Sequence, residues 1–154
     1  MDPKKFSLIG GIVMTAIGIL ALFIPGTLDT LPILKVEYSY GLFLGLFPMN
    51  IVNKFLLIAI GLSGIAAGSA KFTALPLSIK WSRMVMVFMG VAAALGLIPQ
   101  TNTFFGYWPL FGNEVWAHGL FAVAGAYFGF ALSSRVPKIK DQPRDYHSPV
   151  HGIR

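Results

Sequence analysis

Four apolar stretches, each long enough to cross a lipid bilayer as a helix, occupy roughly half of this chain of 154 residues. They run approximately over residues 6–24, 51–70, 81–98 and 115–132. An α-helix needs about 20 apolar residues to cross the hydrocarbon core. An open sheet would leave backbone N–H and C=O groups without partners in lipid, so we expect these stretches to be helices. The sequence therefore predicts an all-α integral membrane protein, built as a four-transmembrane-helix bundle.

Charged residues are few and lie mostly outside the four stretches. They make up 12% of the chain, against about 25% in an ordinary soluble domain. The stretches contain only Lys54 and Arg83, each within about a turn of a span end, where a long cationic side chain can reach the headgroups. We therefore expect one transmembrane domain over residues 1–134 and a basic cytoplasmic tail over residues 135–154.

The positive charge is distributed unevenly about the membrane. If the chain alternates across four helices, all but Lys35 and Lys54 of the 12 Lys and Arg residues fall on one side. Because basic residues near span ends are retained on the cytoplasmic face, both termini are expected there. This topology accounts for the net charge of +6, so no nucleic-acid partner is expected. We predict a multi-pass protein of a bacterial inner membrane or a thylakoid membrane, with its tail near anionic lipid or ordered on a partner protein.

The segments between the helices have distinct patterns. Residues 36–40 alternate like a short strand, and the apolar residues 41–47 are too few to span, so we expect them in the membrane interface. Asn50 precedes the second span as a candidate N-cap. We expect residues 71–80 to form a cytoplasmic loop and residues 100–113 a second external loop.

Tyrosine and tryptophan side chains gather in the two external segments. Such side chains favour the membrane–water boundary, where the ring is buried and the polar atom stays wet. They predict an external aromatic belt, and an aromatic ligand-binding cleft is the alternative. The members of the belt are Tyr38, Tyr40, Tyr107, Trp108 and Trp116.

The two halves of the chain resemble each other weakly. Ile24-Pro25-x-Thr27 closes the first span, and Ile98-Pro99-x-Thr101 closes the third. Each half would begin and end on the cytoplasmic side, as parallel repeats do. The pattern favours a two-plus-two internal repeat.

Glycines recur four residues apart in the second and fourth spans. Such spacing makes a flat groove in which another helix backbone approaches closely. The groove serves either packing within the bundle or contact with a partner subunit or a flat cofactor. The residues are Gly64 and Gly68 in the second span, and Gly125 and Gly129 in the fourth.

His118 is the candidate cofactor-binding residue, about one turn inside the external end of the fourth span. Glu114 lies four residues earlier, on the same helical face. One interpretation is an ordinary interfacial histidine, bonded to a loop carbonyl or to water. The others are the axial ligand of a single tetrapyrrole (haem or chlorophyll) and proton exchange with Glu114. No second histidine lies in a span, so neither a multi-ligand metal site nor a haem with two histidine ligands is expected.

Catalytic patterns are missing from the sequence. There is no cysteine, phosphate-binding glycine loop, serine elbow or HExxH metal motif. The spans contain no paired carboxylates of the kind that ion-coupled pumps use. We therefore do not expect an enzyme.

Two short segments next to the spans carry a resemblance to a known family. Residues 44–50 (LGLFPMN) and 95–102 (LGLIPQTN) resemble small four-helix bacterial membrane proteins catalogued as a domain of unknown function, frequent in actinobacteria and cyanobacteria. The resemblance covers about residues 6–132 and includes Trp116-Ala117-His118. Leu57 stands where the family often has a first histidine, which weakens transfer of a paired site. The resemblance implies the four-helix architecture and no activity.

These observations favour a non-enzymatic accessory or scaffold subunit of a larger membrane complex. Its partners would be membrane lipids and other membrane subunits, or a second copy of itself. The first alternative is a pigment- or haem-binding subunit that uses His118. The second is a small carrier for a lipophilic solute.

The topology gives a direct prediction. A reporter enzyme that works only in the cytoplasm should be active when fused after Arg154, because the flanking cations hold that end inside. The same reporter fused after Asn113 of a shortened chain should be inactive. Reporter activity in the cell measures both, and the reverse pattern would contradict the predicted orientation.

Overall fold

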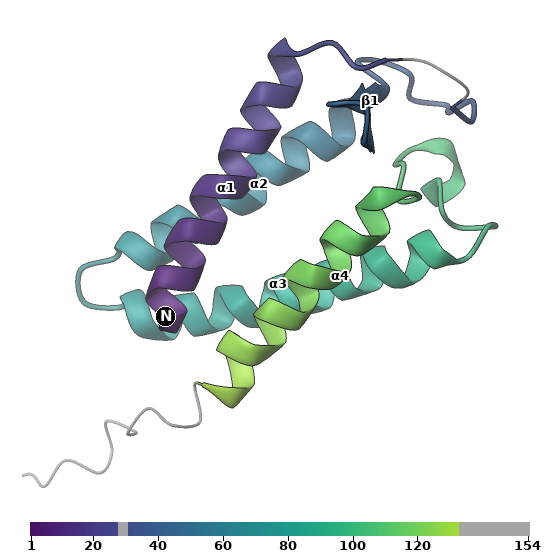
Figure 1. Ribbon diagram of the computed structural model, residues 1–154. Helices are drawn as coiled ribbons and strands as arrows, with labels where there is room; N and C mark the ends of the chain where they lie inside the picture. Colours follow the sequence, from purple (N-terminus) through teal and green to yellow (C-terminus); the bar gives the residue numbers. More distant parts are fainter. Residues whose placement is uncertain (28–30, 133–154) are drawn as a thin grey trace, which may run out of the picture.

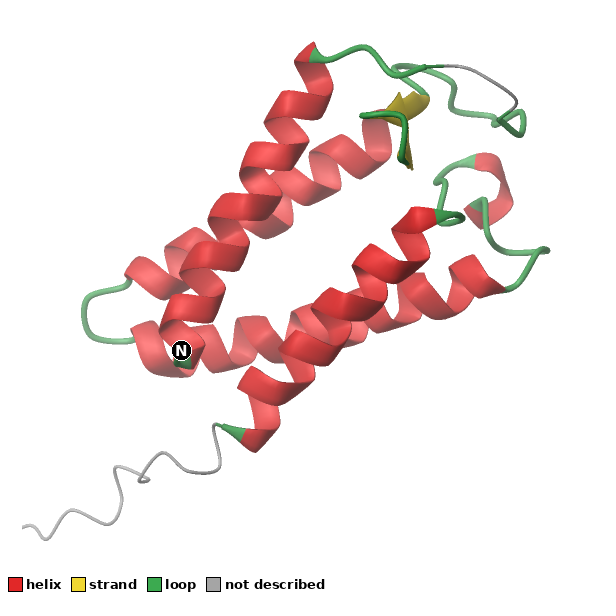
Figure 2. Ribbon diagram, viewed as in Figure 1, coloured by secondary structure: helices red, strands yellow, loops and turns green. Residues whose placement is uncertain are grey.

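The computed structural model describes residues 1–27 and 31–132, and it is mostly helical (Figures 1 and 2). Helices α1, α2 and α3 are each long and apolar enough to cross a membrane, a property typical of a membrane protein. The predicted tail lies outside the described residues. The elements in chain order are α1 (Pro3–Phe23), β1 (Gly41–Phe43), β2 (Phe47–Met49), α2 (Ile51–Ser69), α3 (Ala74–Leu97), the 3₁₀ turn η1 (Phe104–Gly106), α4 (Asn113–Ala126) and the π-helical turn η2 (Tyr127–Ala131).

The helices form two side-by-side pairs, α1 with α2 and α3 with α4. The pairs meet at the end that holds the N-terminus, which we call the N-terminal end (Figure 1). They diverge toward the opposite end, which carries β1 and β2 and is called the loop end.

Glycines allow the backbones of α1 and α2 to touch. A Cβ atom added to Gly11 would lie 2.6 Å from both the Gly61 oxygen and the Ile65 nitrogen, and one added to Gly61 would lie 2.6 Å from the Thr15 nitrogen. Lipid supplies no hydrophobic drive for helix association, so close backbone contact of this kind is what holds such pairs together.

Glycines also allow α3 and α4 to approach closely. A Cβ atom on Gly125 would lie 2.6 Å from the Ser82 oxygen, and one on Gly129 would lie 2.9 Å from the Arg83 side chain. The Arg83 Nε donates a hydrogen bond of 2.8 Å to the Gly129 oxygen. Its guanidinium lies 4.6 Å from the centre of the Phe130 ring. These contacts hold α3 against η2, the helical turn that continues α4.

Trp81 joins the two pairs near the N-terminal end. Its indole Nε1 donates to the Ile60 oxygen of α2 at 3.1 Å. The Trp81 ring is 4% exposed and lies 5.6 Å from the Phe6 ring of α1. Phe6 in turn stacks on Phe128 of η2, with ring centres 4.5 Å apart. All four helical segments therefore meet in one aromatic cluster.

The segment before α2 differs from the prediction. Residues 41–47, expected to lie in the membrane interface, begin a two-stranded antiparallel hairpin in which Gly41 pairs with Met49 and Phe43 with Phe47. Residues 36–40, predicted to be strand-like, form no strand. The turn runs through Leu44 and Gly45, both with positive φ, and three-residue hairpin loops commonly need such a residue. The alternating pattern of residues 36–40 was therefore a weaker indicator of strand than the turn at Leu44 and Gly45.

Helix α3 begins earlier than predicted. Residues 71–80 were expected as a loop, but α3 starts at Ala74 with Pro76 in its first turn. The first N–H groups of a helix have no intrahelical partner, so proline costs little there. The loop is correspondingly short.

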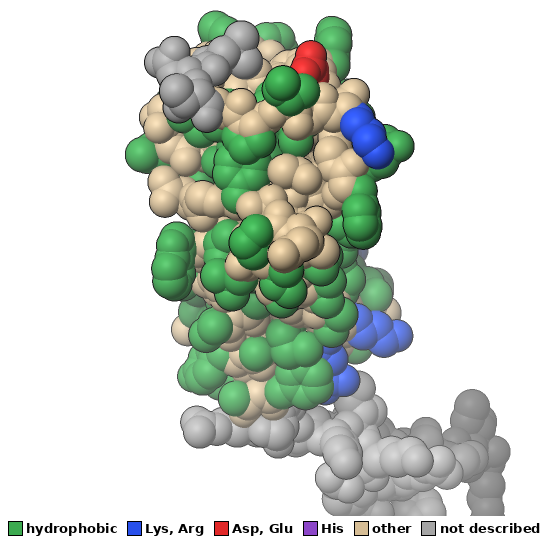
Figure 3. Space-filling model, turned by 90° about the vertical axis from the view of Figure 1, so that its right-hand side faces the viewer, with side chains coloured by type: hydrophobic (Ala, Val, Ile, Leu, Met, Phe, Trp, Pro, Cys, Tyr) green, Lys and Arg blue, Asp and Glu red, His purple; other side chains and the backbone are tan. Residues whose placement is uncertain are grey.

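Apolar side chains cover the outside of the bundle. Leu120 is 71% exposed, and Ile12, Leu62 and Val87 are each at least half exposed. Figure 3 shows hydrophobic side chains over the middle of one face, with charged side chains toward its two ends. A water-soluble helix would place polar residues there, so this surface matches a lipid environment.

The α1–α2 contact predicts a stability difference between two glycines. Gly11→Ala should lower the free energy of unfolding in mild detergent by about 1–3 kcal/mol, because its methyl group meets backbone that has no room to move. Gly119→Ala is the matched control, since a Cβ there meets nothing within 4 Å. Thermal or denaturant unfolding measures both, and equal stability of the two variants would contradict the proposed packing.

Candidate functional site

A carboxyl and an imidazole lie together inside the loop end of α4. Glu114 and His118 are one turn apart, and His118 Nε2 is 3.5 Å from Glu114 Oε2. Glu114 is 4% exposed and His118 is 6% exposed. The structure thus places His118 within the bundle, beside the acid that shares its helical face.

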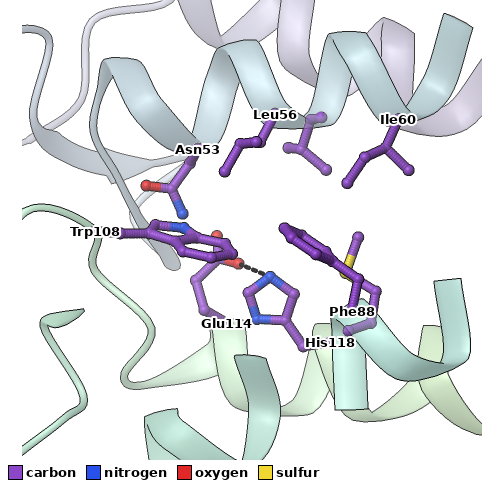
Figure 4. A pocket seen from close by; sticks show the side chains of 9 residues that line it. Asn53, Leu56, Ile60, Phe88, Trp108, Glu114 and His118 are labelled. Carbon is purple, nitrogen blue, oxygen red and sulfur yellow. Dashed lines mark ion pairs between the residues drawn. The ribbon is translucent and has the colours of Figure 1, made fainter. Parts of the chain in front are cut away.

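Trp108 covers this pair from the second loop (Figure 4). Its ring meets the His118 ring edge-on, with centres 6.0 Å apart. It also stacks on Phe88 of α3 at 5.6 Å. Trp108 was predicted to sit in an interfacial belt, and it instead forms a wall of the site.

Asn50, the N-cap of α2, and Asn53, in the first turn of α2, hold the Trp108 loop in place. The Asn50 amide Nδ2 donates to the Tyr107 oxygen at 2.9 Å and to the Val36 oxygen at 3.0 Å. Asn53 Nδ2 donates to the Pro109 oxygen at 3.2 Å. Asn50 also accepts bonds from the first turn of α2 in a capping box with Asn53, which confirms the predicted N-cap.

Two cavities border the Glu114–His118 pair. The smaller, of about 10 Å³, lies toward Asn53 and Trp108 and matches the size of one water molecule. The larger, of about 190 Å³, lies between the two helical pairs, and we call it the inter-pair pocket. It is lined by Met14, Ile17, Phe43, Leu44, Phe47, Met49, Leu57, Met89, Glu114, Ala117, His118 and Phe121.

Three buried polar atoms at this site have no hydrogen-bond partner among the described residues. They are Glu114 Oε1, His118 Nδ1 and Trp108 Nε1. A buried polar group without a partner costs about 1–3 kcal/mol. Such groups in a protein normally meet water or a ligand, so the site is equipped to bind a polar atom.

The arrangement limits which cofactor fits. Within residues 1–27 and 31–132, no group of three His, Cys, Asp or Glu side chains converges to hold a metal ion. An enclosed apolar cavity of about 150 Å³ accommodates benzene. The inter-pair pocket, at about 190 Å³, is therefore large enough for one six-membered ring.

The other predicted site residues lie away from this pair. Gly64 and Gly68 face Ser7 and Leu8 of α1, and Gly125 and Gly129 face α3, so all four contact helices of this chain.

The remaining belt residues divide between the surface and the interior. Tyr38, Tyr107 and Trp116 are more than half exposed, as a belt requires. Tyr40 is turned inward with its hydroxyl buried, and burial raises the pKa of that hydroxyl. Lys54, expected to reach the headgroups, is buried, and its Nζ donates to the Ser39 oxygen at 2.9 Å.

The profile of the family described as Domain of unknown function (DUF4383) matches residues 4–131. The chain belongs to the DUF4383 family. This confirms the resemblance to a family of that kind. No curated protein and no solved structure matches this DUF4383 chain.

Sequence reasoning missed most of the inter-pair pocket. Met14, Phe43 and Met89 come from three separate elements, and each looks like an ordinary apolar residue of its own segment. In the sequence, only Glu114 and His118 indicated a site here, through their spacing of four residues. The rest depends on how the two helical pairs of this DUF4383 protein meet.

Asn50 gives a prediction about the site's framework. Asn50→Ala should lower the free energy of unfolding by about 2–4 kcal/mol, since it removes a helix cap and two loop hydrogen bonds of about 1 kcal/mol each. Asn113→Ala is the control, because Asn113 makes one exposed bond to the Leu46 oxygen and should cost about 1 kcal/mol or less. Unfolding in detergent measures the difference, and a smaller loss for Asn50→Ala than for Asn113→Ala would refute this role.

Proposed function

We propose that this protein is a four-span membrane protein that binds a small lipophilic molecule in the inter-pair pocket. The observation that carries the proposal is an apolar pocket with a buried carboxyl and a buried imidazole at one end, each with an unpartnered atom. Ligand sites are typically apolar hollows with a few well-placed polar groups. The proposed activity is binding without chemical conversion.

The fourth span is part of this proposal. Helix α4 has 14 residues and continues directly into the five residues of η2, and their sum approaches the length needed to cross a bilayer. Together with α1, α2 and α3, the segment of α4 and η2 gives four spans, so that both termini lie on the same side of the membrane. The cation distribution then supports both termini in the cytoplasm and the pocket near the outer face.

The rim of the pocket supports entry from the bilayer. Ile17 of α1 and Ala117 and Phe121 of α4 are only half-buried, although they line the pocket. A lipophilic molecule already dissolved in the membrane reaches this rim without passing through water. This is the geometry expected for a lipid-derived ligand or for the solute of a small carrier.

The accessory-subunit hypothesis has less support. It rested on the small extramembrane mass, on the lack of catalytic motifs in the sequence and on glycine-lined helix faces, and the four glycines contact helices of the same chain. Scaffolding therefore stays a prediction. Co-purification of defined membrane subunits at fixed stoichiometry is its test.

Filling the pocket tests the binding proposal. Ala117→Leu adds three carbon atoms to the pocket wall and should lower ligand occupancy by at least about tenfold, since even 1.4 kcal/mol of lost affinity has that effect. Ala94→Leu, on an exposed position of α3, is the matched control. The measurement is purification into lipid nanodiscs, organic extraction and quantitative mass spectrometry.

Wild type and Ala94→Leu should carry a molecule near one per chain that is depleted in Ala117→Leu. Identical extracts from all three proteins would overturn the proposal. A visible absorption band that is lost in His118→Leu would instead favour the tetrapyrrole alternative.

A further inference from the structure

The size of the inter-pair pocket limits the head of its ligand. This inference rests on the proposed function, and it concerns the chemical class of the molecule bound. The pocket volume of about 190 Å³ exceeds by a modest margin the cavity that holds benzene. One six-membered ring with small substituents fits within this volume.

The walls favour a flat, unsaturated ring. Phenylalanine side chains enter from the β-hairpin and from α4, namely Phe43, Phe47 and Phe121. Met14 and Met89 face the same space from α1 and α3. Aromatic rings pack edge-on or offset against other rings, and thioether sulfurs make favourable contacts with ring edges.

The polar end of the pocket specifies the group on that ring. Glu114 Oε1 can accept a hydrogen bond, and His118 Nδ1 donates or accepts according to its tautomer. A hydroxyl group both donates and accepts, so it can serve either atom. No Lys or Arg stands among the residues that line the pocket, and a carboxylate or phosphate head would face Glu114 without a compensating cation.

The shape of the bundle gives the direction of the tail. Below the pocket, α1 and α4 close together, since a Cβ atom on Gly10 would lie 3.8 Å from the Phe121 ring. Above it, the β-hairpin forms a roof through Phe43 and Phe47. The pocket wall reaches the surface at Leu44, which is 63% exposed, and at the half-buried Ile17 and Ala117, and a tail attached to the ring extends into lipid past the latter two.

We propose that the inter-pair pocket binds a phenolic lipid. Its head is a single hydroxylated ring, as in a phenol or hydroquinone lipid. The hydroxyl group contacts Glu114 and His118, and an apolar tail leaves between α1 and α4. The carboxyl–imidazole pair thus recognises the head, and the aromatic and methionine walls hold the ring.

Three probes, each with a chain of ten carbon atoms, test this class. Native mass spectrometry of the detergent-solubilised protein measures binding of 4-decylphenol, decylbenzene and decanoic acid. We expect one 4-decylphenol per chain, bound about five- to tenfold more tightly than decylbenzene, which is the factor for one net hydrogen bond. Decanoic acid should bind more weakly than 4-decylphenol.

A double variant separates recognition of the head from the presence of the pocket. Glu114→Leu with His118→Leu removes both partners together, a change that membrane and protein interiors tolerate better than loss of one. It should bring 4-decylphenol down to the affinity of decylbenzene and leave decylbenzene binding intact. Ala117→Leu should weaken both probes, and Ala94→Leu should weaken neither.

The outcomes distinguish the two proposals. Equal binding of 4-decylphenol and decylbenzene to the wild type, with loss of both in Ala117→Leu, would overturn the phenolic head and retain the lipophilic pocket. Tighter binding of decanoic acid than of 4-decylphenol would also overturn it. Binding of no probe, or binding that Ala117→Leu does not change, would overturn both proposals.

Discussion

The indole of Trp81 is the contact on which the arrangement of the two helical pairs depends. Its ring lies against Gly64, whose added Cβ would come within 2.6 Å of it, and its N–H binds the backbone of α2. A ring of this size fits between the pairs only because glycine faces it. The pairs are thereby joined near the N-terminal end, and they diverge toward the loop end, where the β-hairpin and the inter-pair pocket lie (Figure 1).

Polar groups are concentrated where the pairs diverge. The glycine contacts of α1 with α2 and of α3 with α4 are made to backbone atoms and, apart from Arg83, to uncharged side chains. Near the loop end, by contrast, Glu114 and His118 are buried beside an apolar pocket. Burial of such groups without full pairing is costly. Three of the buried atoms without a partner among the described residues, those of Glu114, His118 and Trp108, lie together at this end of the molecule.

The sequence predicted features that depend on local patterns. The three long apolar helices followed from apolar length, the start of α2 from Asn50, and the Glu114–His118 pairing from a spacing of four residues. The start of α3 was misjudged because Pro76 looked like a loop residue. The β-hairpin was missed because residues 36–40 alternate more clearly than residues 41–49. The inward turn of Trp108 and the pocket were beyond prediction, since both result from the meeting of distant segments.

The bonds of Asn50 have a mechanical consequence. One amide group joins the start of α2 to the backbone of both loops at this end of the molecule, and Asn113 ties the tip of the β-hairpin to α4. The β-hairpin and the two loops, which cover the loop end of the molecule, are thus held to the starts of α2 and α4 by several hydrogen bonds. These bonds must break together if this cover moves away from the helices. The half-buried rim between α1 and α4 has no such ties in the described residues. Under the binding proposal, a ligand therefore exchanges between α1 and α4 rather than through this cover.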